Sequence, residues 1–84
     1  MAMFTDIQFD PASGRHELHF VNQQFDHLMC IYWVESKKDY AFNVSDAEAL
    51  EIAGSSWGGK FSVSEQLQRA RKELPEMDRT KPKA

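Results

Sequence analysis

The stretch LMCIYWV, residues 28–34, decides the fold, because it is the longest unbroken apolar run in the chain and polar segments bound it on both sides. Its mixture of β-branched and aromatic side chains is typical of a β-strand. The run is far shorter than the roughly 20 residues needed to cross a membrane. We therefore expect the strongest strand of the protein at this position, and no membrane span.

Additional strands are predicted on both sides of this segment. Residues 4–9 alternate roughly between apolar and polar side chains, and residues 10–14 (DPASG) have a composition that favours a turn. Residues 16–21 place apolar side chains on one face, and residues 40–44 alternate again. The pattern predicts three to four antiparallel strands joined by short turns.

The second half of the chain changes to helical periodicity. Residues 45–48 (SDAE) form a capping box, and the short helix that begins there should end at Gly54. Residues 62–65 (SVSE) form a second box, which opens a longer helix that ends before Pro75. The apolar stripe of this helix, spaced four, three and four residues apart, is Val63, Leu67, Ala70 and Leu74.

These elements predict an α+β fold, in which a three- to four-stranded antiparallel sheet is followed by two helices packed on one face. A chain of 84 residues has room for one domain. We assign this domain to residues 1–75. Residues 76–84 are short of apolar side chains and rich in charge, so we expect a flexible C-terminal tail.

Cysteine content and charge bear on the compartment and on partners. The one cysteine, Cys30, cannot form an intramolecular disulfide, and the N-terminus does not resemble a signal peptide, so we expect a cytoplasmic protein. Up to Gly59 there are nine acids against three bases, and from Lys60 onward there are seven bases against four acids. This asymmetry serves solubility alone, or lets an acidic body and a basic end meet different partners.

The 28–34 strand is apolar on both of its alternating faces. In the register set by a four-residue turn at residues 23–26, Met29, Ile31 and Trp33 lie beneath the helices. Two short helices are too few to cover the other side as well. Either the tail or nearby lysine stems shield that side, or it binds a second copy or a different protein. The predicted interface, chosen for its aromatic anchors, comprises Leu28, Cys30, Tyr32, Trp33 and Val34, with Trp57 at its rim.

The predicted strands at residues 16–21 and 28–34, with the turn that joins them, also contain a pattern of metal-ligating residues, His16-x2-His19-x7-His27-x2-Cys30. A separation of three residues puts side chains on opposite faces of a strand, which divides His16 from His19 and His27 from Cys30. The register above brings His19 opposite Cys30, so at most two ligands converge, whereas a structural zinc site needs four. We therefore predict no metal site and no cofactor, and leave adventitious metal binding by these residues open.

Two further patterns weigh against catalysis. Residues 54–60 (GSSWGGK) match G-x4-G-K, but Phe61 replaces the hydroxyl residue that binds magnesium and the loop follows a helix. An interhelical loop with Trp57 over the core is expected instead. Cys30 and His19 can form a thiolate pair, and a buried structural thiol is the alternative. We predict no enzyme.

The competing function is nucleic-acid binding by the basic C-terminal helix and tail. Four interspersed acids dilute this charge, the acidic body repels a polyanion, and no pair of stacking aromatics accompanies the basic residues. Nucleic-acid binding is therefore the second interpretation. The basic residues concerned are Arg69, Arg71, Lys72, Arg79, Lys81 and Lys83.

The stretch LHFVNQQFDHLMC, residues 18–30, is similar to short bacterial proteins of unknown function that carry a β-hairpin ending in a cysteine. This resemblance implies no residue roles. Taken together, the residues predict a small non-catalytic protein-interaction or regulatory module. We expect it to self-associate as a homodimer, or to bind another protein, through an apolar face of the sheet.

Overall fold

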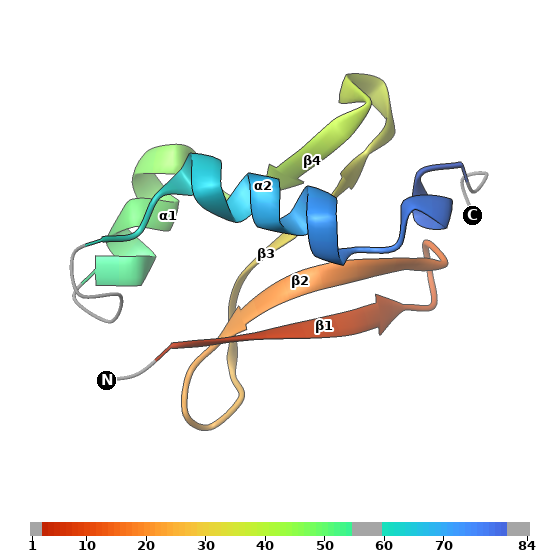
Figure 1. Cartoon of the computed structure of the whole chain (residues 1–84). Helices are drawn as coiled ribbons and strands as arrows, with labels where there is room; N and C mark the ends of the chain where they lie inside the picture. The colour runs from red at the N-terminus through yellow and green to blue at the C-terminus, as the bar shows by residue number, and fades with distance from the viewer. Residues whose placement is uncertain (1–2, 55–59, 81–84) are drawn as a thin grey trace.

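The structure is a computed structural model that describes residues 3–54 and 60–80. Within these residues a four-stranded antiparallel sheet, ordered β1-β2-β3-β4, is followed in sequence by two helices (Figure 1). The predicted α+β fold is therefore confirmed. The elements are β1 (Phe4–Asp10), β2 (Arg15–Val21), β3 (His27–Val34), η1 (Glu35–Lys37), β4 (Asp39–Phe42), α1 (Asp46–Ala53), α2 (Val63–Glu73) and η3 (Glu76–Thr80), where η marks a 3-10 helix.

Short turns join the strands at the predicted places. Gly14 closes the β1–β2 hairpin with φ of 73°, a conformation that a residue without a Cβ adopts easily, and its N–H donates to the carbonyl of Asp10 at 2.8 Å. In the β2–β3 turn, the Asn22 side-chain oxygen accepts from the backbone N–H groups of Gln24 at 2.9 Å and Asp26 at 3.0 Å. Such local side-chain bonds fix the turn and with it the register of the strands.

The pairing of β2 with β3 follows the predicted register and then shifts. A β-bulge beside Phe20 pairs Val21 with His27, so β3 contributes one residue more than β2. Because of this extra residue, the first side chains of β3 face the opposite side of the sheet from the one that regular pairing would give. Leu28 therefore packs against the core, and His27 lies beside His19 on the other side, which corrects both predicted positions. The predicted pair of His19 with Cys30 is confirmed, and the pairs Leu18 with Ile31 and Phe20 with Met29 belong to the same register.

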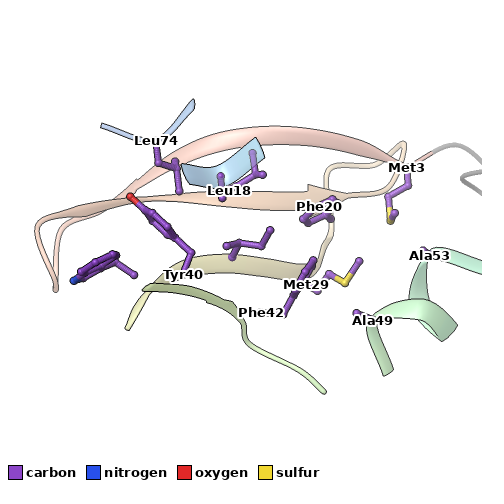
Figure 2. Packing of buried hydrophobic residues seen from close by; sticks show 12 residues of the cluster. Met3, Leu18, Phe20, Met29, Tyr40, Phe42, Ala49, Ala53 and Leu74 are labelled. Carbon is purple, nitrogen blue, oxygen red and sulfur yellow. The ribbon is translucent and has the colours of Figure 1, made fainter. Parts of the chain in front are cut away.

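The core fills the space between the sheet and the helices (Figure 2). Phe20 and Phe42 stack with ring centroids 5.7 Å apart, and Phe61 meets both rings edge-on at 6.0 and 6.2 Å. Trp33 and Tyr40 form a T-shaped pair at 5.2 Å. Aromatic pairs of this kind stabilise a core beyond the area that they bury. The other buried members are Met3, Leu18, Met29, Ile31, Ala49, Ala53, Ala70 and Leu74.

Both helices begin at the predicted caps. Ser45 Oγ accepts from the N–H of Glu48 at 3.2 Å, and Ser62 Oγ accepts from the N–H of Glu65 at 3.3 Å. Helix α1 packs on β3, and α2 packs on β3 and β4. The helix layer therefore lies mainly over the β3–β4 half of the sheet. No helix in the described ranges is long and apolar enough to cross a membrane.

The first part of the predicted tail contacts the sheet. Residues 76–80 form η3, and Asp78 is buried with 1% of its surface exposed. Asp78 Oδ2 accepts from the backbone N–H of His16 at 2.8 Å and lies 2.9 Å from His16 Nδ1, while Arg15 Nε donates to the Asp78 carbonyl at 3.1 Å. A polar segment is thus anchored to β2 by a buried carboxylate. Residues 81–84 of the predicted tail lie outside the described residues.

Candidate functional site

Large apolar side chains are exposed along β1, the strand at one edge of the sheet. Phe4, Ile7 and Phe9 are 49%, 41% and 53% exposed. Ile7 pairs with Leu18 and Phe9 with His16, which places both apolar residues on the helix side of the sheet. We call Phe4, Ile7 and Phe9, with the outer backbone of their strand, the β1 edge.

The β1 edge is exposed because the helix layer covers this strand only in part. Helix α2 contacts this strand through a polar side chain, since Arg69 donates to Thr5 Oγ1 at 2.7 Å. Phe9 meets the His16 ring edge-on, with centroids 5.2 Å apart. Side chains that would suit a core therefore face water. Within the described residues β1 has a neighbouring strand on one side, so its outer N–H and C=O groups are open to another strand.

The residues of the predicted β3 interface do not form one exposed surface in the structure. Tyr32 is 37% exposed on the side away from the helices, next to a hollow of about 320 Å³ that Arg15 and Glu17 also line. The apolar surface on that side is therefore smaller than the sequence predicts. Of the other predicted interface residues, Cys30 is buried, Val34 is half-buried, Leu28 and Trp33 pack with the core, and Trp57 lies outside the described residues.

Potential metal ligands gather on the side of the sheet away from the helices. Glu17 and His19 are two residues apart on β2 and share this side, and His19 lies opposite Cys30. One ligand atom of each residue lies within 4.8 Å of the other two. His19 Nε2 is 2.9 Å from Glu17 Oε1, while His19 Nδ1 is buried without a hydrogen-bond partner in the described part of the chain. Three donors thus converge where the sequence predicted at most two.

A fourth donor lies beside these three. The β-bulge turns His27 to the same side, and its ring centroid is 4.8 Å from that of His19. His16, the remaining histidine of the sequence pattern, lies on the helix side with Asp78. We call Glu17, His19, His27 and Cys30 the outer cluster.

The surroundings of Cys30 disfavour a nucleophilic role. Burial, followed by the negative charge of Glu17, raises the pKa of the Cys30 thiol to about 11. The thiol is therefore protonated at neutral pH, whereas the thiolate is the nucleophile. The backbone of Cys30 is also fixed, because its N–H donates to Asn43 Oδ1 at 2.9 Å and its carbonyl accepts from the Asn43 N–H at 3.0 Å. Of the two predicted interpretations, the buried structural thiol fits these surroundings better.

The arginines assigned to nucleic-acid binding make contacts within the chain. Arg71 donates two hydrogen bonds to the Asp39 carboxylate, both at 2.9 Å, and these bonds lower the pKa of Asp39. Arg69 donates to Glu73 at 2.6 Å, and Arg79 donates to the carbonyl of Arg71 at 2.7 Å. The Arg71 pair joins α2 to β4, the Arg79 bond joins η3 to α2, and the Arg69 pair lies within α2, so the three side chains have a structural role.

Sequence reasoning missed the β1 edge and the contribution of Glu17. Alternation in residues 4–9 predicts an apolar face but does not say whether a helix covers it. The signal that was present is the strand order, because the first strand of a chain of hairpins lies at an edge of the sheet. Glu17 carried the weaker signal of lying two residues from His19, on the same face.

Comparison of the chain with protein-family models, with curated proteins and with solved structures gives no match in any of the three. The β1 edge and the outer cluster are therefore the features of the chain that bear on its function.

Proposed function

We propose that the protein is a small interaction module that forms a homodimer by pairing the β1 strands of two copies. The observation that carries this proposal is the exposure of Ile7 and Phe9, which lie on the helix side of a seven-residue edge strand. An edge strand with exposed apolar side chains and open backbone groups readily adds a further strand. The proposal moves the predicted self-association from the face of β3 to the β1 edge.

The sequence of β1 suits antiparallel pairing with a second copy of itself. A two-fold axis at Ile7 pairs the whole strand and keeps both helix layers on the same side of one continuous sheet. Thr5 then lies opposite Phe9 of the second copy, and Asp6 lies opposite Gln8. The Gln8 amide can donate to Asp6 across the axis, as it does within the chain at 3.3 Å. Ile7 and Phe9 of both copies then form one apolar surface on the helix side of the sheet.

Neighbouring registers are disfavoured by charge. A two-fold axis at Asp6 would place two Asp6 carboxylates opposite each other, and an axis at Gln8 would place Asp6 opposite Asp10. Like charges directly opposite each other destabilise a pair of strands. The Ile7-centred register avoids such pairs, so the strand favours one dimer geometry.

The exposed apolar area sets the expected strength of the dimer. Full burial of a phenylalanine or isoleucine side chain contributes about 1.5–3 kcal/mol relative to full exposure. Ile7 and Phe9 are about half exposed, so each gains roughly half of that amount. Association itself costs several kcal/mol, which offsets much of this gain. We therefore expect a weak, reversible dimer whose population rises with protein concentration.

Size-exclusion chromatography with light scattering, over a range of protein concentrations, tests the proposal. The variant Ile7→Glu places two carboxylates at the two-fold axis and should give a monomer at concentrations where the wild-type protein is a dimer. Leu50→Glu is the matched control, because Leu50 is a similarly exposed apolar residue on α1. Tyr32→Glu tests the side of the sheet away from the helices.

The three variants separate the possible interfaces. A dimer that persists in Leu50→Glu and Tyr32→Glu and is lost in Ile7→Glu supports the β1 edge. A dimer lost in Tyr32→Glu and retained in Ile7→Glu would move the interface to the face of β3. A wild-type protein that remains monomeric at high micromolar concentration would overturn self-association altogether.

A further inference from the structure

We propose that the outer cluster binds one zinc ion, with Cys30, His19 and His27 as ligands and Glu17 as the residue that positions His19. The site lies on the opposite side of the sheet from the helices and is independent of the dimer proposed above. Thiolate and imidazole groups are the donors that zinc prefers, and three protein ligands leave its fourth tetrahedral position to water or to another molecule.

The two nitrogens of His19 have the arrangement that a metal-binding histidine needs. Nε2 lies 2.9 Å from Glu17 Oε1, so a proton on Nε2 donates to the carboxylate and leaves a lone pair on Nδ1. Nδ1 is buried and has no hydrogen-bond partner among residues 3–54 and 60–80. A buried acceptor without a partner destabilises a fold, and a metal ion at this nitrogen would remove that cost. A carboxylate on the second ring nitrogen is the usual support of a histidine that binds a metal.

The other two ligands are brought to His19 by the pairing of the strands. Cys30 lies directly opposite it on β3, and their ligand atoms are within 4.8 Å of each other. His27 reaches the same side through the β-bulge, with its ring centroid 4.8 Å from that of His19. Ligand atoms of one tetrahedral zinc ion are about 3.3–3.8 Å apart, so the side chains, His27 above all, must rotate to bring their ligand atoms together when zinc binds. In regular pairing His27 would face the helix side, so the β-bulge is what places His27 beside the other two ligands.

The charges in the outer cluster also suit a divalent cation. The carboxylate of Glu17 and the thiolate that Cys30 becomes on binding together balance the charge of one zinc ion. The thiol proton is released to solvent as the sulfur–zinc bond forms, and no redox step is involved. Zinc would link β2 to β3 beside the β-bulge, where the regular pairing of the two strands is interrupted.

Metal titration of the untagged, reduced protein tests the site. After removal of metal by a chelator, Zn²⁺ is added in competition with a chromogenic chelator, and Co²⁺ is used to observe ligation by absorption. We expect one equivalent of Zn²⁺ bound with submicromolar affinity, a sulfur-to-cobalt charge-transfer band, and a higher melting temperature with zinc. Far-UV circular dichroism shows whether each variant is folded.

Four variants assign the roles. Cys30→Ser should abolish the charge-transfer band, and His19→Gln should weaken zinc binding at least about 100-fold, whereas loss of a positioning carboxylate in Glu17→Gln should weaken it about 10- to 100-fold. His16→Gln is the matched control, because His16 is on the same strand but faces the helix side, and its zinc affinity should be unchanged. Absence of the band in the folded wild-type protein, or equal affinity in Cys30→Ser, would overturn the site. Loss of binding in Glu17→Gln as complete as in His19→Gln would show that Glu17 is itself a ligand.

Discussion

The two edge strands of the sheet are protected to very different degrees. β4 has four residues, and its Phe42 is 9% exposed because the helices and Phe61 cover it. β1 has seven residues, and its Phe9 is 53% exposed although it also lies on the helix side. The same residue type thus contributes to the core at one edge and to the surface at the other. The position of the helix layer, and not the sequence of either strand, makes this difference.

The C-terminal segments supply the protection of β4. Arg71 of α2 binds Asp39 at the start of the strand with two hydrogen bonds of 2.9 Å. The Arg79 guanidinium of η3 lies 5.2 Å from the centroid of the Tyr40 ring, a cation–π contact. Edge strands are commonly protected by shortness, by charged side chains and by covering segments, and β4 has all three. β1 has an acidic residue, Asp6, in its middle and is otherwise open to a partner strand.

The largest expected effect comes from removing the two edge phenylalanines in turn. Phe42→Ala leaves a cavity in the core and should lower the free energy of unfolding by about 3–5 kcal/mol. Phe9→Ala removes a half-exposed side chain and should lower it by less than about 1 kcal/mol. Urea unfolding at protein concentrations low enough to keep the chain monomeric measures both values. Similar losses in the two variants would show that the edges are equally protected.

The next effect concerns the anchor of η3. Asp78→Ala removes the buried carboxylate that accepts from His16 and should cost about 2–3 kcal/mol, because hydrogen bonds to a buried charge are among the stronger ones. The loss of this anchor should also free Arg79 from the Tyr40 ring. Proteolysis should then cleave residues 76–80 faster than in the wild-type protein. Glu76→Gln, an exposed position in the same 3-10 helix, is the control and should leave both measurements unchanged.

The elements of this fold were predictable because local signals specified them. Turn residues at 10–14 and serine caps at Ser45 and Ser62 marked boundaries that the structure confirms within one or two residues. The stripe of α2 and the predicted register of β3 identified five of the twelve buried core residues: Met29, Ile31, Trp33, Ala70 and Leu74. These features depend on residues that are close in sequence, so they can be predicted from the sequence alone.

The parts that were wrong depend on contacts between distant segments. Leu28 and His27 were misplaced because the β-bulge that shifts them is set by the whole hairpin and leaves no mark in the composition. The contact of residues 76–80 with the sheet was not predictable, because Asp78 resembles any surface aspartate until His16 is known to lie beside it. To predict the outer cluster, the same β-bulge would have to be known. To predict the exposure of the β1 edge, the extent of the helix layer would have to be known.

The smallest effect tests the ion pair at the start of β4. Hydrogen bonds from Arg71 hold the pKa of the Asp39 carboxyl below its usual value, so the folded state binds a proton there less readily than the unfolded state does. The stabilisation is therefore fully present above the unfolded pKa and is lost as the pH falls through the folded pKa. The pair is partly exposed, so its contribution is about 0.2–1 kcal/mol.

Asp39→Asn keeps the side-chain oxygen that accepts from the Tyr40 N–H, and it should destabilise the protein at pH 7 but not at a pH below the folded pKa. Urea unfolding of both proteins across this range measures the difference, and a difference that does not change with pH would mean that the charge of Asp39 does not stabilise β4.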